Sequence, residues 1–97
     1  MLSAREVITQ RKTDILALAA RHGARRVRIF GSVARDEAVE SSDIDFLLEL
    51  EPGRSLLDQV ALQQDLGELL GCRVEVVVEG GLSPYLKDQI LAEALSL

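Results

Sequence analysis

The segment from Gly31 to Leu50, GSVARDEAVESSDIDFLLEL, places the tightest constraint on how this chain can fold. Gly31-Ser32 follows an apolar run that ends at Phe30, and a short helix-like stretch comes next. Asp43-Ile44-Asp45 then opens a second apolar run, Phe46-Leu47-Leu48. Glycine lets a phosphate approach the backbone closely, and alternate carboxylates on a strand can share one cation. The segment therefore indicates nucleotide and metal chemistry built between two strands.

Length and charge limit the classes of protein to consider. A chain of 97 residues favours one domain, residues 1–97, with one hydrophobic core. The formal net charge of -5 disfavours a broad nucleic-acid surface, which needs a basic excess. The single Cys72 fits a reducing compartment. The polar first residues argue against a secretory signal, and every apolar run falls short of the ~20 residues that span a bilayer, so we expect a cytoplasmic protein.

Apolar periodicity and turn residues predict four helices that alternate with three strands. Three strands cannot close a barrel, so the expected fold is α/β (α+β), with a small open mixed sheet backed by helices and a fourth strand left as an alternative. The predicted helices are Ser3–His22, 32–38, one between the cap Ser55 and the stop Gly71, and one from Ser83-Pro84 to the C-terminus; the strands are Ala24–Phe30, Ile44–Leu50 and Arg73–Glu79.

Side-chain alternation along the strands separates an apolar face from an acidic one. Successive residues of a strand point to opposite faces, so Asp43 and Asp45 share one face while Ile44 and Phe46 share the other. On the third strand Glu75 takes the acidic side in the same way. We expect the apolar faces to pack on the long helices, and the acidic faces to line an open groove where Glu75 lies near the two aspartates.

The acidic residues fit a magnesium site. At strand rise the Cα atoms of Asp43 and Asp45 lie about 6.5–7 Å apart, which lets both carboxylates converge on one cation. Mg²⁺ takes one or two carboxylates and completes its shell with water and substrate phosphates. A second metal would need a third carboxylate, which Glu75 can supply.

The turn at Gly31-Ser32, which precedes the acidic residues in the chain, fits a phosphate group. The helix that follows Gly31-Ser32 presents free N–H groups, the Ser32 hydroxyl adds a donor, and Arg35 can reach a phosphate oxygen. Taken alone, each feature has an ordinary explanation: a turn, a solvated Asp pair, an exposed strand glutamate. Their combination, in this order and around these strands, favours a functional site.

Gly31-Ser32-Val33-Ala34-Arg35, followed by Asp43-Ile44-Asp45 at the start of a strand, resembles the signature of the DNA polymerase beta-like nucleotidyltransferase superfamily. The short chain is similar to the minimal nucleotidyltransferases, the antitoxins of prokaryotic pairs whose toxin is a HEPN-domain ribonuclease. The resemblance implies that Gly31 and Ser32 bind the triphosphate of ATP. It further implies that Asp43 and Asp45 ligate Mg²⁺ and that Glu75 takes the place of the third carboxylate.

The implied activity is transfer of AMP from ATP to a tyrosine hydroxyl of the partner toxin. Two residues depart from the family pattern: Asp36 stands where many relatives have glycine, and Glu75 stands where aspartate is typical. Larger superfamily members add a helical domain that grips the acceptor, and we expect a partner or a second copy to take that role here.

Two other hypotheses stay open. One is an antitoxin that neutralises its toxin by binding alone, and the other is a small-molecule nucleotidyltransferase completed by another chain. The sequence leaves the nucleotide preference, the acceptor residue, the number of metals and the homo- or hetero-oligomeric state undetermined.

Overall fold

The computed structural model describes residues 3–39 and 43–97. Ten short elements follow one another in this part of the chain: α1 (Ala4–Gln10), α2 (Lys12–Arg21), β1 (Ala24–Phe30), α3 (Gly31–Ala34), β2 (Ile44–Leu50), α4 (Leu56–Leu70), β3 (Val74–Val78), the 3₁₀ turn η1 (Glu79–Gly81), α5 (Pro84–Glu93) and β4 (Leu95–Ser96).

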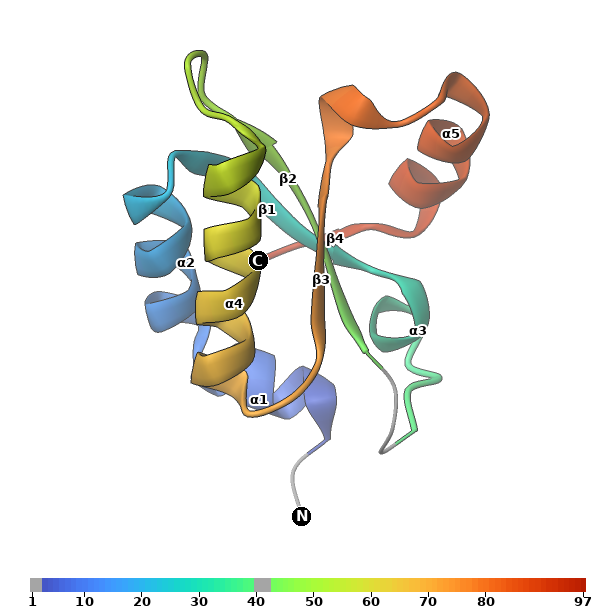
Figure 1. Ribbon diagram of the computed structural model, residues 1–97. Coiled ribbons are helices and arrows are strands. Elements are labelled where there is room, and N and C mark those ends of the chain that lie inside the picture. The colour runs from blue at the N-terminus through green and yellow to red at the C-terminus, as the bar shows by residue number, and fades with distance from the viewer. Residues whose placement is uncertain (1–2, 40–42) are drawn as a thin grey trace.

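The strands form one open mixed sheet in the order β3-β2-β1-β4. β1 pairs antiparallel with β2 and with β4, while β2 pairs parallel with β3. Figure 1 shows α2 and α4 side by side on one face of this sheet, with α5 on the other face and α3 near the end of β1. The predicted α/β class with an open mixed sheet is confirmed, and the sheet has four strands.

The core lies between the sheet and the α2–α4 layer. Ile44, Phe46 and Leu48 of β2 are buried on this face, as the alternation of apolar residues predicts. From the helices, Ile15 of α2 and Leu62 of α4 are fully buried against them. The central position of β2 explains why its apolar side chains are the most deeply covered in the sheet.

Helix α4 also covers the free edge of the sheet. The Gln59 side chain donates to the carbonyl of Val76 at 2.9 Å, and the Val76 N–H donates to the Gln63 side chain at 3.0 Å. These bonds satisfy backbone groups on the outer side of β3, where an uncovered strand would be a template for aggregation.

The predicted first helix is divided. Ser3 caps it as expected, but α1 ends at Gln10 and α2 begins at Lys12, with Arg11 between them outside helical geometry. The Thr9 hydroxyl donates to the Arg5 carbonyl at 2.9 Å, a contact that bends helices. The prediction of one unbroken helix was therefore wrong at this point.

The chain also ends differently from the prediction. Helix α5 begins at Pro84 with Ser83 as its cap, but it stops at Glu93 because Ala94 is extended. Leu95–Ser96 then pair with β1 as the edge strand β4, and the Leu97 N–H donates to the Val27 carbonyl at 3.2 Å. This pairing satisfies backbone groups of β1 that a helix could not reach. Each helix in the described residues is too short or too polar to cross a membrane.

Candidate active site

The strand register brings the predicted residues to one end of the sheet. Phe30 at the end of β1 lies opposite Asp45 on β2, and Asp45 lies opposite Glu75 on β3. Because β1 runs antiparallel to β2, the residue after Phe30 meets the start of β2, which places Gly31 against Asp45. Two strand pairings thus bring together the glycine turn and the acidic residues. Strand alternation predicted that Asp45 and Glu75 share a face, and the antiparallel pairing of β1 with β2 adds the turn.

Gly31 has a backbone conformation that few other residues could adopt. Its φ angle is +75°, in the left-handed region that favours glycine. A side chain here would also collide with the Asp45 carboxylate, which occupies the space where a Cβ atom would lie. The turn can therefore bring its backbone close to the carboxylate only because residue 31 is glycine.

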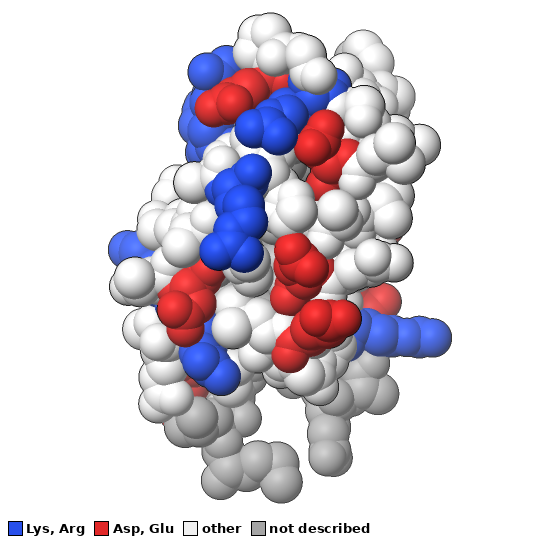
Figure 2. Space-filling model, turned by 60° about the vertical axis from the view of Figure 1, so that its left-hand side comes forward, with Lys and Arg blue, Asp and Glu red and all other residues white. Residues whose placement is uncertain are grey.

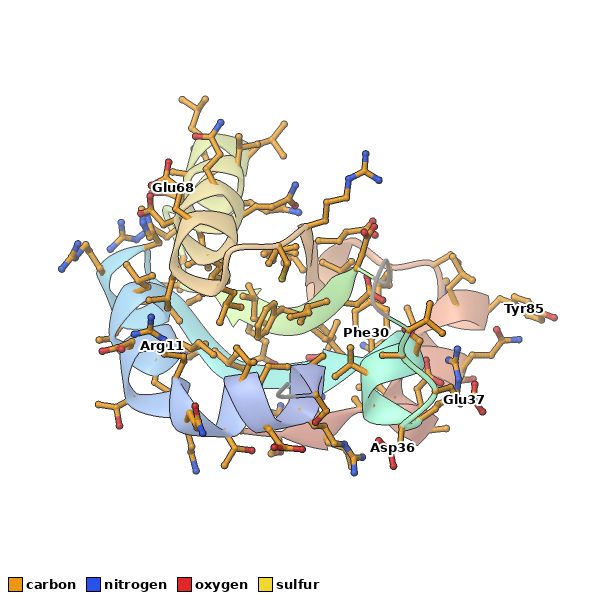
Figure 3. The ribbon with its side chains drawn as sticks, turned by 90° about the horizontal axis from the view of Figure 1, so that it is seen from below. Arg11, Phe30, Asp36, Glu37, Glu68 and Tyr85 are labelled. Atoms are coloured by element: carbon orange, nitrogen blue, oxygen red, sulfur yellow. The ribbon has the colours of Figure 1, made fainter. Side chains whose placement is uncertain are left out.

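Helix α3 is shorter than predicted and ends in a Schellman motif. The Asp36 N–H donates to the Val33 carbonyl at 3.2 Å, and the Glu37 N–H donates to the Ser32 carbonyl at 2.8 Å. Asp36 takes the left-handed conformation that the motif requires, with φ of 59°. Aspartate tolerates this region better than most residues, so the departure from glycine at this position keeps the turn. Figure 3 shows Asp36 and Glu37 at this end of α3.

The carboxylates repel one another. The pKa of Asp45 is raised to about 6 by its partial burial, by the charges of Glu75, Asp43 and Glu93, and by a hydrogen bond shared with the Glu75 side chain. Partial burial weakens the hydration that would otherwise stabilise the charged form. Repulsion between two carboxylates at hydrogen-bonding distance is relieved by a proton or by a cation. The pair formed by Asp45 and Glu75 is therefore suited to bind a metal ion.

The donor set suits Mg²⁺. Asp45 and Glu75 supply hard oxygen ligands side by side, and Asp43 lies close enough for its charge to raise the pKa of Asp45. Within residues 3–39 and 43–97, no group of three or more histidine, cysteine or acidic side chains forms a ready-made metal cage. Two carboxylates with water and substrate phosphates match the way Mg²⁺ is usually bound.

A cleft of about 500 Å³ adjoins the carboxylates. Asp43 and Glu75 line one part of it, and Arg73 with the two glutamines of α4 that cover β3 line the rest. The cleft is open and mostly polar, so it gives access to Asp43 and Glu75 from the β3 side.

Sequence reasoning missed Glu93, the last residue of α5. One carboxylate oxygen accepts the Gly31 N–H at 3.1 Å, and the other accepts from Arg35 Nη1 at 2.8 Å. Hydrogen bonds to Glu93 and Glu37 raise the pKa of the Arg35 guanidinium. Glu93 lies 62 residues from Gly31 in the chain, and nothing in the local sequence around it indicates this contact.

The acidic face is less open than predicted. Further along the strands Leu47 is fully buried on this face, and Arg28 beside it is 8% exposed. Arg28 forms an ion pair with Glu79 of η1 at 3.3 Å. The groove is therefore restricted to the end of the sheet that holds Asp45, because η1 and α5 cover the remainder.

The arginines of β1 are ion-paired. Arg25 and Arg26 both lie near Glu49, at 3.7 Å and 3.2 Å. These basic residues at the start of β1 therefore share one acidic partner. Figure 2 shows basic and acidic side chains beside one another on one face of the molecule. Ion pairing of this kind does not give the concentrated positive potential that nucleic-acid binding needs.

The sequence model of the nucleotidyltransferase domain family matches residues 12–97. The chain belongs to this family. It is 46% identical over 90 residues to MJ0435 of Methanocaldococcus jannaschii, which has a provisional assignment as a protein adenylyltransferase; the match covers 93% of this chain and 97% of that one. It is 36% identical over 89 residues to the protein adenylyltransferase MntA of Thermococcus cleftensis, covering 92% and 87%.

Comparison with solved structures leads to the same family assignment. A provisionally assigned minimal nucleotidyltransferase superposes with a TM-score of 0.87 at 53% identity, covering 95% of this chain and 94% of that one. The MNT antitoxin in a complex with a tri-AMPylated HEPN toxin of Shewanella oneidensis shares the fold, with a TM-score of 0.71 at 19% identity and coverage of 91% and 69%. The resemblance to minimal nucleotidyltransferases is confirmed, and the chain is a nucleotidyltransferase.

Proposed function

We propose that this nucleotidyltransferase transfers AMP from MgATP to a tyrosine hydroxyl of a HEPN-domain ribonuclease toxin. By this modification it would act as the antitoxin of that toxin. The observation that carries the proposal is the alignment of Phe30, Asp45 and Glu75 across three strands, which sets the glycine turn against an acidic pair. Relatives at 46% and 36% identity carry the name protein adenylyltransferase, which supports AMP as the transferred group.

The phosphate groups of ATP are assigned to the turn. Gly31 offers a backbone N–H, Ser32 a hydroxyl and Arg35 a guanidinium that projects from the end of α3. Backbone N–H groups and arginine are the donors that proteins use for phosphate oxygens. Together they would fix the triphosphate with its α-phosphorus toward the carboxylates.

Asp43, Asp45 and Glu75 would hold the metal. Bound there, Mg²⁺ would neutralise charge on the phosphoryl oxygens as it develops. Burial and the neighbouring carboxylates raise the pKa of Asp45 to about 6, and the charge of a bound cation would offset that repulsion. Glu75 is exposed at the cleft, where it can accept the proton of an incoming hydroxyl.

The reaction is an in-line displacement. The acceptor oxygen forms a bond to the α-phosphorus, the bond from that phosphorus to the bridging oxygen breaks, and pyrophosphate leaves with the electron pair. The hydroxyl proton passes to Glu75. The cleft beside β3 is open, so an acceptor carried by a separate protein can enter it.

The test combines chain, toxin, Mg²⁺ and ATP and follows the intact mass of the toxin. The toxin should gain the mass of one or more AMP groups, and peptide mapping should place them on tyrosine. The D43N/D45N variant should lose at least a hundredfold in transfer rate and keep its circular-dichroism spectrum, while D14N on exposed α2 should transfer as the wild type does. A folded, toxin-bound chain that leaves the toxin mass unchanged would rule the transfer out.

A second candidate is neutralisation by binding alone. The observation that favours it is the longer Glu75 in place of the aspartate that is typical of the family. Ribonuclease inhibition that persists with D43N/D45N, without any AMP on the toxin, would establish this candidate.

A further inference from the structure

Glu93 binds two of the groups that the proposed function assigns to the triphosphate. Its two carboxylate oxygens are used separately, one by the Gly31 N–H at 3.1 Å and one by Arg35 at 2.8 Å. The side chain comes from the last residue of α5, a helix that contacts α3. An anion from the C-terminal part of the chain is thus bound to the glycine turn.

A carboxylate and a phosphate compete for the same donors. A carboxylate is planar and a phosphate is tetrahedral, but the oxygens of both accept charge-assisted hydrogen bonds from N–H groups, and arginine binds either of them. The Gly31 N–H has one hydrogen to donate. A phosphate oxygen can therefore bind this N–H only after the Glu93 carboxylate has left it.

We propose that Glu93 acts as an internal substitute for phosphate in the nucleotide-free chain, and that the ATP triphosphate displaces its carboxylate from Gly31 and Arg35. The proposal rests on the proposed function, because it requires that this turn bind a nucleotide. Glu93 then affects the affinity for nucleotide in two ways. It keeps the Gly31 N–H and the Arg35 guanidinium oriented in the free chain, and it weakens nucleotide binding because its carboxylate must first be displaced.

Two further observations support this role. Glu93 is near enough to Asp45 for its charge to add to the repulsion in the acidic cluster. Displacement would move that charge away as the nucleotide brings its own. Arg35 has a second partner, Glu37 at 3.1 Å, on an exposed part of the turn, so the guanidinium stays paired when Glu93 leaves.

The test measures binding of Mg–AMP-PNP to the chain alone by calorimetry, without any toxin. E93Q removes the charge, and E93D keeps it but shortens its reach by one methylene. Both should bind Mg–AMP-PNP about tenfold more tightly than the wild type. The matched control is E37Q, which loses an exposed pair to the same arginine without touching Gly31, and its affinity should stay within twofold.

Two readouts separate competition from a general structural effect. Inorganic tripolyphosphate should show the same tightening with E93Q, whereas adenosine, which has no phosphate, should bind all variants alike. The Gly31 amide resonance should move in E93Q and in the nucleotide-bound wild type, while amide resonances of α4 stay in place.

The outcomes distinguish the two proposals. Wild-type binding of Mg–AMP-PNP with unchanged or weaker binding by E93Q and E93D overturns the role of Glu93 and leaves the proposed function standing. Equal tightening by E37Q would show that total charge matters rather than shared donors, and it would also overturn the role. Absence of binding by wild type and variants together overturns both.

Discussion

The two faces of the sheet are covered in different ways. Helix α4 places Leu62 and Leu66 fully inside the apolar core and covers the β3 edge with two glutamines. Helix α5 has no buried residue, and Leu86 and Tyr85 on it are exposed. Figure 3 shows Tyr85 pointing away from the body of the protein. Hydrophobic burial holds α4 in place, whereas α5 has no fully buried side chain and makes polar contacts with the end of the sheet through Glu93.

Those polar contacts come from the site. Glu93 links the end of α5 to Gly31 and Arg35, and Arg28 links η1, which precedes α5, to the acidic face of the sheet. Apolar burial is worth about 25 cal/mol per Å², while a partly exposed ion pair such as Arg35–Glu93 contributes little. The core face thus supplies most of the stability, and the end of α5 is held to the turn by Glu93 bonds for which an anionic ligand would compete.

The largest predicted effect tests this division of stability. Leu62→Ala should lower the free energy of unfolding by about 2–5 kcal/mol, because it removes a fully buried side chain and leaves a cavity. Leu86→Ala, the matched change on α5, should cost less than about 1 kcal/mol because that side chain is 48% exposed. Urea unfolding followed by circular dichroism measures both. Equal losses would show that α5 is part of the same core.

The core face and the strands could be predicted from sequence because their signals are local. Glycines mark both ends of β1 and the C-terminal end of α4, and Ser55 caps the start of α4. The alternation of side chains along β2 was enough to assign Asp45 to the face away from the core. The sequence predicted that Glu75 lies near the two aspartates if the two strands pair, but it did not predict the parallel register that sets Asp45 opposite Glu75.

The contacts that were missed depend on tertiary structure. β4 forms because β1 offers an edge at the place where Leu95 arrives, and Glu93 meets Gly31 because β4 fixes the end of α5. Neither segment carries a distinctive pattern: residues 94–97 read as the continuation of an apolar helix. The break at Arg11 likewise follows from a side-chain bond to a carbonyl rather than from a Gly or Pro.

The repulsion among the carboxylates of the site should lower the stability of the folded chain. The pH dependence of an Asp45 substitution measures how large this loss is. Its pKa rises from 3.8 to about 6 on folding, so between these values the folded chain binds more protons than the unfolded chain. Stability from this group is therefore present below pH 4 and is lost as the pH rises through about 6. With a discount for partial exposure, Asp45→Asn should stabilise the metal-free chain by roughly 1–2 kcal/mol at pH 8 and hardly at all at pH 4.

Asp58 on the core side provides the control of opposite sign. Hydrogen bonds from the Ser55 backbone lower its pKa, so its contribution is present above the ordinary aspartate range and is lost on acidification. Asp58→Asn should therefore destabilise the chain at pH 8, and the difference should shrink toward pH 3. Thermal melting across pH with EDTA present measures both variants. A stability gain for Asp45→Asn that stays constant with pH would contradict the charge-repulsion account.

The smallest effect compares the caps of the two helices. Ser55 accepts the Leu57 N–H at 3.2 Å while its own N–H donates to Asp58 at 2.8 Å, whereas Ser83 only accepts the Leu86 N–H at 3.4 Å. Ser55→Ala should cost about 1 kcal/mol of global stability, and Ser83→Ala a few tenths. Because α5 is held apart from the core, the Ser83→Ala loss should appear in hydrogen exchange of α5 amides alone, with α4 amides unchanged. If Ser83→Ala lowered protection in α4 as well, the two helices would unfold as one unit, and the contrast between the two faces would fail.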